Sequence, residues 1–118
     1  MSIRNNESEF VTYVIDSMQP LGCVHAKRMF GGHGIFLQGL MFGLIADSVL
    51  YLKADKDLEN DFIVRRLEAF QYQKKNKLFK ISYYQVPEEA LENDDVMFEW
   101  ATKSYQAAIR AADKKRVK

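Results

Sequence analysis

Three side chains in the first third of the chain carry groups that could bind a metal ion or act in nucleophilic catalysis. They are the thiol of Cys23 and the imidazoles of His25 and His33. Strong zinc sequences pair their ligands as C-x-x-C or H-E-x-x-H, and neither spacing occurs here. A nucleophilic thiol also needs a positioned base, and neighbouring side chains on one face of a strand rarely point at each other. We therefore expect a buried thiol, two histidines at the surface or in turns, and no metal, cofactor or catalytic residue.

Glycines beside His33 are a second candidate for chemistry, because glycine-rich loops can bind phosphate groups. The glycines are Gly31, Gly32 and Gly34. No Gly-Lys-Ser/Thr follows them, and they do not form the G-x-G-x-x-G pattern that opens a helix in dinucleotide-binding proteins. A strand pattern follows instead. The pair Gly31-Gly32 therefore predicts a hairpin turn that reaches positive φ.

Paired carboxylates could serve as a general acid and base, and they occur at Glu88-Glu89 and Asp94-Asp95. Both pairs stand where helices are expected to begin, and there capping and the helix dipole account for acidic residues. Because no nucleophile, base or carboxylate pair forms a convincing constellation, we expect that the protein is not an enzyme.

A cluster of lysines, Lys74, Lys75, Lys77 and Lys80, lies on one predicted hairpin close to several aromatic residues. Cations interleaved with aromatic rings can bind single-stranded nucleic acid. The alternative is a solvated edge whose lysines oppose strand-to-strand aggregation, and we favour it because aromatic residues that alternate in a strand usually face the core. The end of the chain is also basic, which suits the C-terminus of a helix.

Two charges interrupt an otherwise apolar segment, residues 27–55. Arg28, next to Met29, could anchor a carboxylate of a partner protein, or it could be an edge-facing or salt-bridged arginine. Lys27 precedes it. If the segment carries function directly, we expect Lys27 and Arg28 to make the protein contacts.

Hydropathy patterns place these residues on a series of short elements. Apolar residues at three- and four-residue steps predict a helix over residues 7–18. Strands are predicted over residues 24–30, 34–38, 41–46 and 49–53, joined by turns so short that neighbouring strands must be antiparallel.

The second half of the chain alternates helices and strands. A central helix is predicted over residues 58–67, strands over 70–74 and 77–86, and a short helical segment after Pro87. Asn93 or Asp94 caps a last helix over residues 95–112. The expected fold class is α+β, an antiparallel meander sheet of five to six strands with an N-terminal, a central and a C-terminal helix packed on it.

Composition supports one ordered domain over residues 1–118. The chain is 47% hydrophobic, enough for a real core at this size. Its formal net charge is +1, whereas a free-standing DNA-binding domain is more often clearly basic. A single cysteine, an N-terminus without an apolar signal core and the lack of a membrane-length apolar run lead us to expect a cytoplasmic protein with no membrane contact.

Three segments, in this order along the chain, resemble the N-terminal domain of the TfoX/Sxy family of competence regulators, also called DNA transformation proteins. They are Arg28-Met29-Phe30-Gly31-Gly32, Leu50-Tyr51-Leu52-Lys53, and Ser82-Tyr83-Tyr84 with Pro87-Glu88-Glu89-Ala90-Leu91. The resemblance extends over residues 10–112. The chain ends soon after its last helix, so we expect a single TfoX N-terminal-like domain without the C-terminal domain of full-length members.

The resemblance implies an α+β domain of the bacterial cytoplasm without catalytic residues. It further implies a positive regulator of DNA-uptake gene transcription that works with the cyclic-AMP receptor protein at promoters. We therefore expect a non-enzymatic interaction domain that contacts this receptor or RNA polymerase, reaches DNA only indirectly and could form a homodimer. The alternative is direct nucleic-acid binding by the Lys74–Lys80 hairpin and the basic C-terminal tail.

Overall fold

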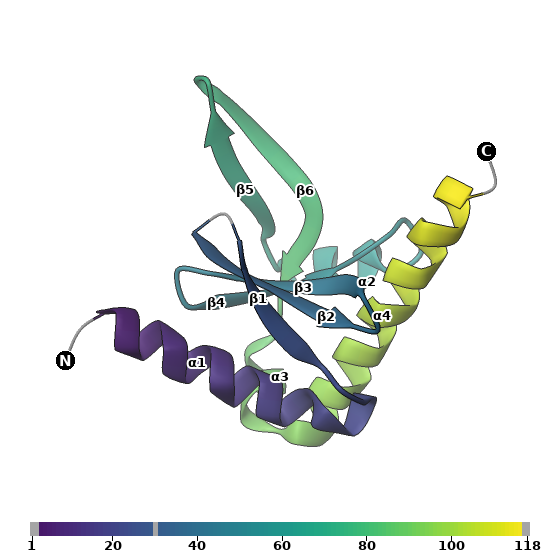
Figure 1. Cartoon of the computed structure of the whole chain (residues 1–118). Helices are drawn as coiled ribbons and strands as arrows, with labels where there is room; N and C mark the ends of the chain where they lie inside the picture. The colour runs from purple at the N-terminus through teal and green to yellow at the C-terminus, as the bar shows by residue number, and fades with distance from the viewer. Residues whose placement is uncertain (1–2, 30, 117–118) are drawn as a thin grey trace.

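The structure, a computed structural model, describes residues 3–29 and 31–116, and the side chains of residues 3–6, 73, 74, 79, 80 and 116 lie outside this description. It contains a six-stranded antiparallel sheet with its helices on one side (Figure 1), which confirms the α+β fold class. In chain order the elements are α1 (Ile3–Met18), the 3-10 turn η1 (Gln19–Leu21), β1 (His25–Met29), β2 (Gly32–Leu37), β3 (Leu40–Ala46), β4 (Val49–Lys53), α2 (Glu59–Ile63), β5 (Ala69–Lys74), β6 (Lys77–Gln85), α3 (Glu88–Glu92) and α4 (Asp94–Arg116).

The first four strands form the predicted meander, and the last two join it in reversed order. The strand order is β1-β2-β3-β4-β6-β5, so β6 pairs with β4 and β5 lies at the edge. Tight turns join the strands at the predicted Asp47-Ser48 and Lys75-Asn76, and at Gln38-Gly39 one residue earlier than predicted. The turn residues have positive φ: Gln38 (52°), Gly39 (78°), Asp47 (52°), Ser48 (60°), Lys75 (51°) and Asn76 (64°). The β5–β6 hairpin rises away from the helical layer (Figure 1).

One face of the sheet forms the core with the helices. Its buried side chains include Ile35, Ile45, Leu50 and Leu52. They pack against the apolar stripe of α1 and the inner face of α4, which presents Met97, Trp100, Ala101, Ala107 and Ala108. The alanines allow α4 to approach β3 and β4 closely, because they add little side-chain volume between the two layers.

The helices differ in length from the prediction. The central helix is shorter, because after Ile63 the chain turns and Arg66 adopts a positive φ of 60°. The last helix extends four residues beyond its expected end. Its predicted cap is confirmed at Asn93, whose Oδ1 accepts hydrogen bonds from the backbone N–H groups of Asp95 (2.8 Å) and Val96 (3.2 Å).

The glycine pair does not act as a simple turn. Gly31 has a φ of 74° and makes the turn, but Gly32 already belongs to β2, so this strand begins two residues earlier than predicted. A Cβ on Gly32 would lie 2.3 Å from the backbone oxygen of Ile45. Gly32 is therefore required by the close approach of β2 and β3, and not by backbone conformation.

The expectation of a buried Cys23 is wrong. Cys23 is exposed and precedes β1, so it does not share a strand face with His25. Phe30, predicted to end the first strand, lies outside the described residues. Within the described part of the chain, no helix has the length and apolar character needed to cross a membrane.

Candidate functional site

The sheet face opposite the helices carries its own apolar cluster. Strand register places Lys27, Gly34, Leu44 and Tyr51 in one row across β1 to β4, on the face that points away from the core row of Ala26, Ile35, Gly43 and Leu52. Leu44 is only 5% exposed, yet it is not part of the main core. We call this surface the open sheet face.

Methionine and aromatic side chains close over Gly34 at the centre of the open sheet face. A Cβ at this position would meet Met29 Sδ at 2.5 Å, Phe36 Cε1 at 2.9 Å and Met41 Sδ at 3.3 Å. These three side chains are each half-buried. Methionine side chains adapt their shape readily, so such a cluster suits a surface that binds another protein.

Aromatic rings continue this surface onto the β5–β6 hairpin. Tyr51 and Phe70 meet edge to face at 5.1 Å, and Phe70 stacks on Tyr72 at 6.3 Å between ring centroids. Lys53 Nζ lies 5.3 Å from the centroid of the Tyr83 ring. Burial raises the pKa of Tyr83 to about 12, so this hydroxyl stays neutral at physiological pH.

The two predicted protein-contact residues lie on opposite faces of β1. Lys27 pairs with Gly34 in the register and belongs to the open sheet face, whereas Arg28 pairs with His33 on the helix side. Both side chains are exposed. Side chains alternate along a strand, so Lys27 and Arg28 cannot serve the same flat contact surface.

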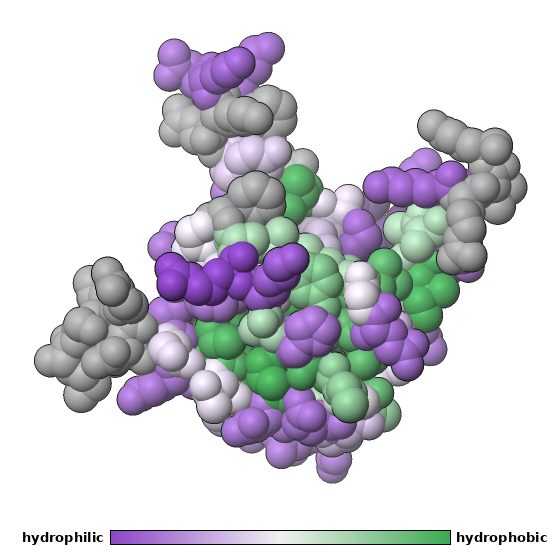
Figure 2. Space-filling model, in the orientation of Figure 1, coloured by the Kyte–Doolittle hydropathy of each residue, from purple (hydrophilic) through white to green (hydrophobic). Residues whose placement is uncertain are grey.

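The predicted lysine hairpin is present as β5 and β6. Lys75 and Lys77 are exposed at its tip, which is the hydrophilic projection at the top of Figure 2. The side chains of Lys74 and Lys80 lie outside the described set. The hairpin therefore holds at least two cations away from the body of the domain, and Tyr72, 41% exposed, lies farther down the same hairpin.

Cys23, His25 and His33 do not form a common site. His25 stacks on Phe36 at 5.8 Å, and His33 Nδ1 is buried without a hydrogen-bond partner among the described residues. No group of three His, Cys, Asp or Glu side chains in the described part of the chain is arranged to hold a metal ion.

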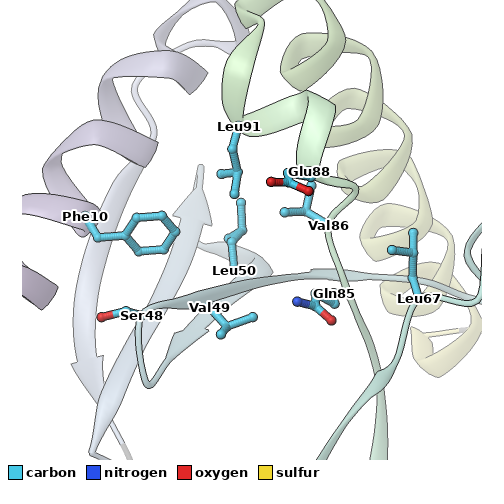
Figure 3. A pocket seen from close by; sticks show the side chains of 9 residues that line it. All are labelled: Phe10, Ser48, Val49, Leu50, Leu67, Gln85, Val86, Glu88 and Leu91. Atoms are coloured by element: carbon cyan, nitrogen blue, oxygen red, sulfur yellow. The ribbon is translucent and has the colours of Figure 1, made fainter.

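An apolar pocket of about 300 Å³ lies between α1, α3 and the ends of β4 and β6 (Figure 3). The sequence did not predict it, because its residues come from five separate segments. Its lining consists of Phe10, Ser48, Val49, Leu50, Leu67, Gln85, Val86, Glu88 and Leu91.

An ion pair between Arg110 and Asp55, which the sequence did not predict, connects α4 to the loop before α2. The Asp55 side chain is largely buried, and that of Arg110 is partly exposed. Arg110 donates to Asp55 through Nε (2.6 Å) and one terminal nitrogen (2.9 Å), and Asp55 also accepts a hydrogen bond from the Leu58 backbone. The Arg110 hydrogen bond lowers the pKa of Asp55 from 3.8 to about 2. Arg110 thus does more than complement the dipole of α4, because it fixes one end of this helix to the loop before α2.

Replacing Asp55 by asparagine is expected to lower the free energy of unfolding at pH 7 by about 1–2 kcal/mol, since Arg110 is partly solvated. The unfolded chain binds a proton at Asp55 more readily than the folded one. Stability from this pair is therefore present above about pH 4 and lost as the pH falls toward 2. Urea unfolding at several pH values should show that the free energy of unfolding falls less on acidification in the variant than in the parent protein. Asp57→Asn is the matched control, because Asp57 is 77% exposed and lies 3.6 Å from Arg110 Nε.

These features define a small two-layer α+β domain with one covered and one open sheet face. The chain belongs to the TfoX N-terminal domain family, whose sequence profile matches residues 16–108. It is similar to the DNA transformation protein TfoX1 of Aliivibrio fischeri, with 30% identity over 82 residues. This match covers 70% of the chain and 37% of the relative, so the chain spans much less than the relative's full length. The family resemblance drawn from the sequence is confirmed.

Proposed function

We propose that this domain acts in the control of competence (DNA-uptake) genes through contacts with other proteins, and that it is not an enzyme. Membership of the TfoX family and similarity to a DNA transformation protein support a role in competence. The proposal of protein contacts rests on the open sheet face. Its half-buried cluster of Met29, Phe36 and Met41 has the character of an interface centre, where methionine and aromatic residues are enriched.

The chemistry of this face favours a partner surface with an apolar centre and acidic residues at its border. Lys27 lies beside the apolar cluster, and Lys53 lies farther along the same face over Tyr83. The partners we propose are the cyclic-AMP receptor protein and RNA polymerase, with DNA reached indirectly through them. A second copy of the chain could occupy the same face, and light scattering distinguishes this homodimer from a monomer.

The variant Lys27→Glu is expected to weaken capture of the partner at least about tenfold, because it places a carboxylate where the partner presents its own. Arg28→Glu is a closely matched control, since this exposed neighbour makes the same charge change on the opposite face. Pull-down experiments with the cyclic-AMP receptor protein and with RNA polymerase measure how much of each protein the two variants capture. Capture of neither protein by the unaltered domain, or equal loss in both variants, would contradict the proposed contact surface.

Direct nucleic-acid binding is the second candidate, and the projecting hairpin with Lys75 and Lys77 at its tip favours it. Binding of this kind depends on phosphate contacts and should weaken sharply with salt. A gel shift with single- and double-stranded DNA at low and high salt tests it. Tight binding that is lost in a double variant, Lys75→Glu with Lys77→Glu, would favour this function over the first.

A further inference from the structure

We propose that the apolar pocket between α1 and α3 is a docking site for one bulky apolar side chain carried by a lysine- or arginine-rich segment of a partner protein. This inference goes beyond the proposed function, because it concerns a surface separate from the open sheet face. It rests on three features of the pocket, which are its apolar walls, its acidic rim and the contacts that hold it open.

The walls of the pocket are mainly apolar, and the pocket is shallow enough for a single side chain to reach its floor. Figure 3 shows Leu91 extending from α3 toward Leu50, and Phe10 extending from α1 into the same space from the side. Leu50 and Val86 are buried at 1% and 4% exposure and form the floor, whereas Phe10 and Leu91 are only half-buried. A volume of about 300 Å³ is at the lower limit for small-molecule sites and suits a single leucine, methionine or phenylalanine side chain.

Two carboxylates border this apolar hollow. Glu88 lines the pocket, is exposed, and has no hydrogen bond or ion pair among the described residues. Glu7 lies at the other wall, where its Oε1 is 3.3 Å from the backbone nitrogen of Ser48. Ser48 itself lines the pocket. The rim therefore presents two carboxylates, Glu88 from α3 and Glu7 from α1.

Among the described side chains, two cations lie in the segment that precedes Leu67 in the pocket wall. Arg65 is engaged by Glu89 and lies over the Trp100 ring, and Arg66 is exposed. An excess of carboxylates around an apolar hollow complements lysine and arginine and repels phosphate groups.

The walls are held in place by hydrogen bonds between the elements that form them. The Tyr13 hydroxyl donates to the Leu91 carbonyl and joins α1 to α3. The backbone nitrogen of Val86 donates to the Leu50 carbonyl at 3.0 Å, which ties the start of α3 to β4. A pocket that exists before binding requires less ordering when an occupant enters, so it can select a short segment.

The test begins with a random dodecapeptide library displayed on phage and selected against the purified domain, followed by fluorescence polarisation with the enriched peptides. Enriched peptides should share a leucine, methionine or phenylalanine next to lysine or arginine. Alanine in place of that apolar residue should weaken binding about tenfold, and binding should fall with added salt without vanishing.

Charge reversal at the rim provides the protein-side measurement. Glu88→Lys should weaken the selected peptides about tenfold, whereas Asp16→Lys, an exposed change on the outer side of α1, should leave them unaffected. A thermal unfolding curve checks that both variants fold. The proposal is overturned if no basic-apolar peptide is enriched, if Glu88→Lys binds as well as the parent, or if acidic peptides or nucleic acids compete equally.

Discussion

Replacing Phe62 by alanine is expected to lower the free energy of unfolding by about 3–5 kcal/mol. The Phe62 side chain is fully buried, and its ring lies 5.3 Å from Tyr84 and 5.0 Å from Trp100. It is therefore a buried apolar contact through which α2 packs on both β6 and α4. Removing the ring would leave a cavity among three elements, and the five-residue α2 is too short to close it by shifting alone.

Urea unfolding followed by circular dichroism measures this effect, with Ile63→Ala as the matched control. Ile63 is the next residue of α2 and is 50% exposed, so its replacement should change stability by less than about 0.5 kcal/mol. Equal effects at the two positions would show that α2 contributes through helix formation alone and that the Phe62 contacts add little.

Replacing Gly32 by alanine is expected to cost about 3 kcal/mol, the upper end of the range for inserting a methyl group into a packed site. The new Cβ would meet the Ile45 backbone oxygen at 2.3 Å and its carbonyl carbon at 3.3 Å. Because these atoms belong to the neighbouring strand, relief requires β2 and β3 to separate, and no side chain can rotate to absorb the contact.

The control for Gly32 is Gly39→Ala in the β2–β3 turn. No atom lies within 4 Å of a Cβ at Gly39, but its φ is 78°, so the cost is the conformational penalty of about 1 kcal/mol. Differential scanning calorimetry of the two variants should rank Gly32 as the more destabilising change. The reverse ranking would mean that backbone conformation, and not the approach of β3, is the reason for glycine at position 32.

The candidate surfaces show where reasoning from sequence reaches its limit. Lys27 and Arg28 stand out in the sequence as charges within an apolar segment, and both are exposed in the structure. Their separation onto two faces follows from strand alternation, but which face is open depends on where α1 and α4 pack. The pocket gave no local signal, since Phe10, Leu50 and Leu91 are far apart in the chain and each fits an ordinary apolar pattern.

The two surfaces make different demands on a partner. The open sheet face offers an apolar cluster with Lys27 beside it, whereas the pocket offers an apolar hollow bordered by carboxylates. Under the two proposals, we expect them to bind different partners, or parts of one partner that carry opposite charge. Lys27→Glu and Glu88→Lys report on them separately.

Local chemistry in the sequence determined the elements and most of the turns of this protein. Alternating apolar residues specify the strands, and Asp47 and Asn76 mark hairpin turns because Asp and Asn tolerate positive φ. Asn93 caps α4 because its side chain reaches N–H groups only two and three residues away. The family also followed from short local segments.

Tertiary structure alone decided the features that join distant parts of the chain. The placement of β6 beside β4, the need for glycine at position 32 and the Asp55–Arg110 pair each depend on segments that meet only after folding. The pocket and the open sheet face arise in the same way, from how two layers cover each other. Such features depend on which surfaces remain uncovered when the core is packed, and a periodic pattern within one segment does not contain that information.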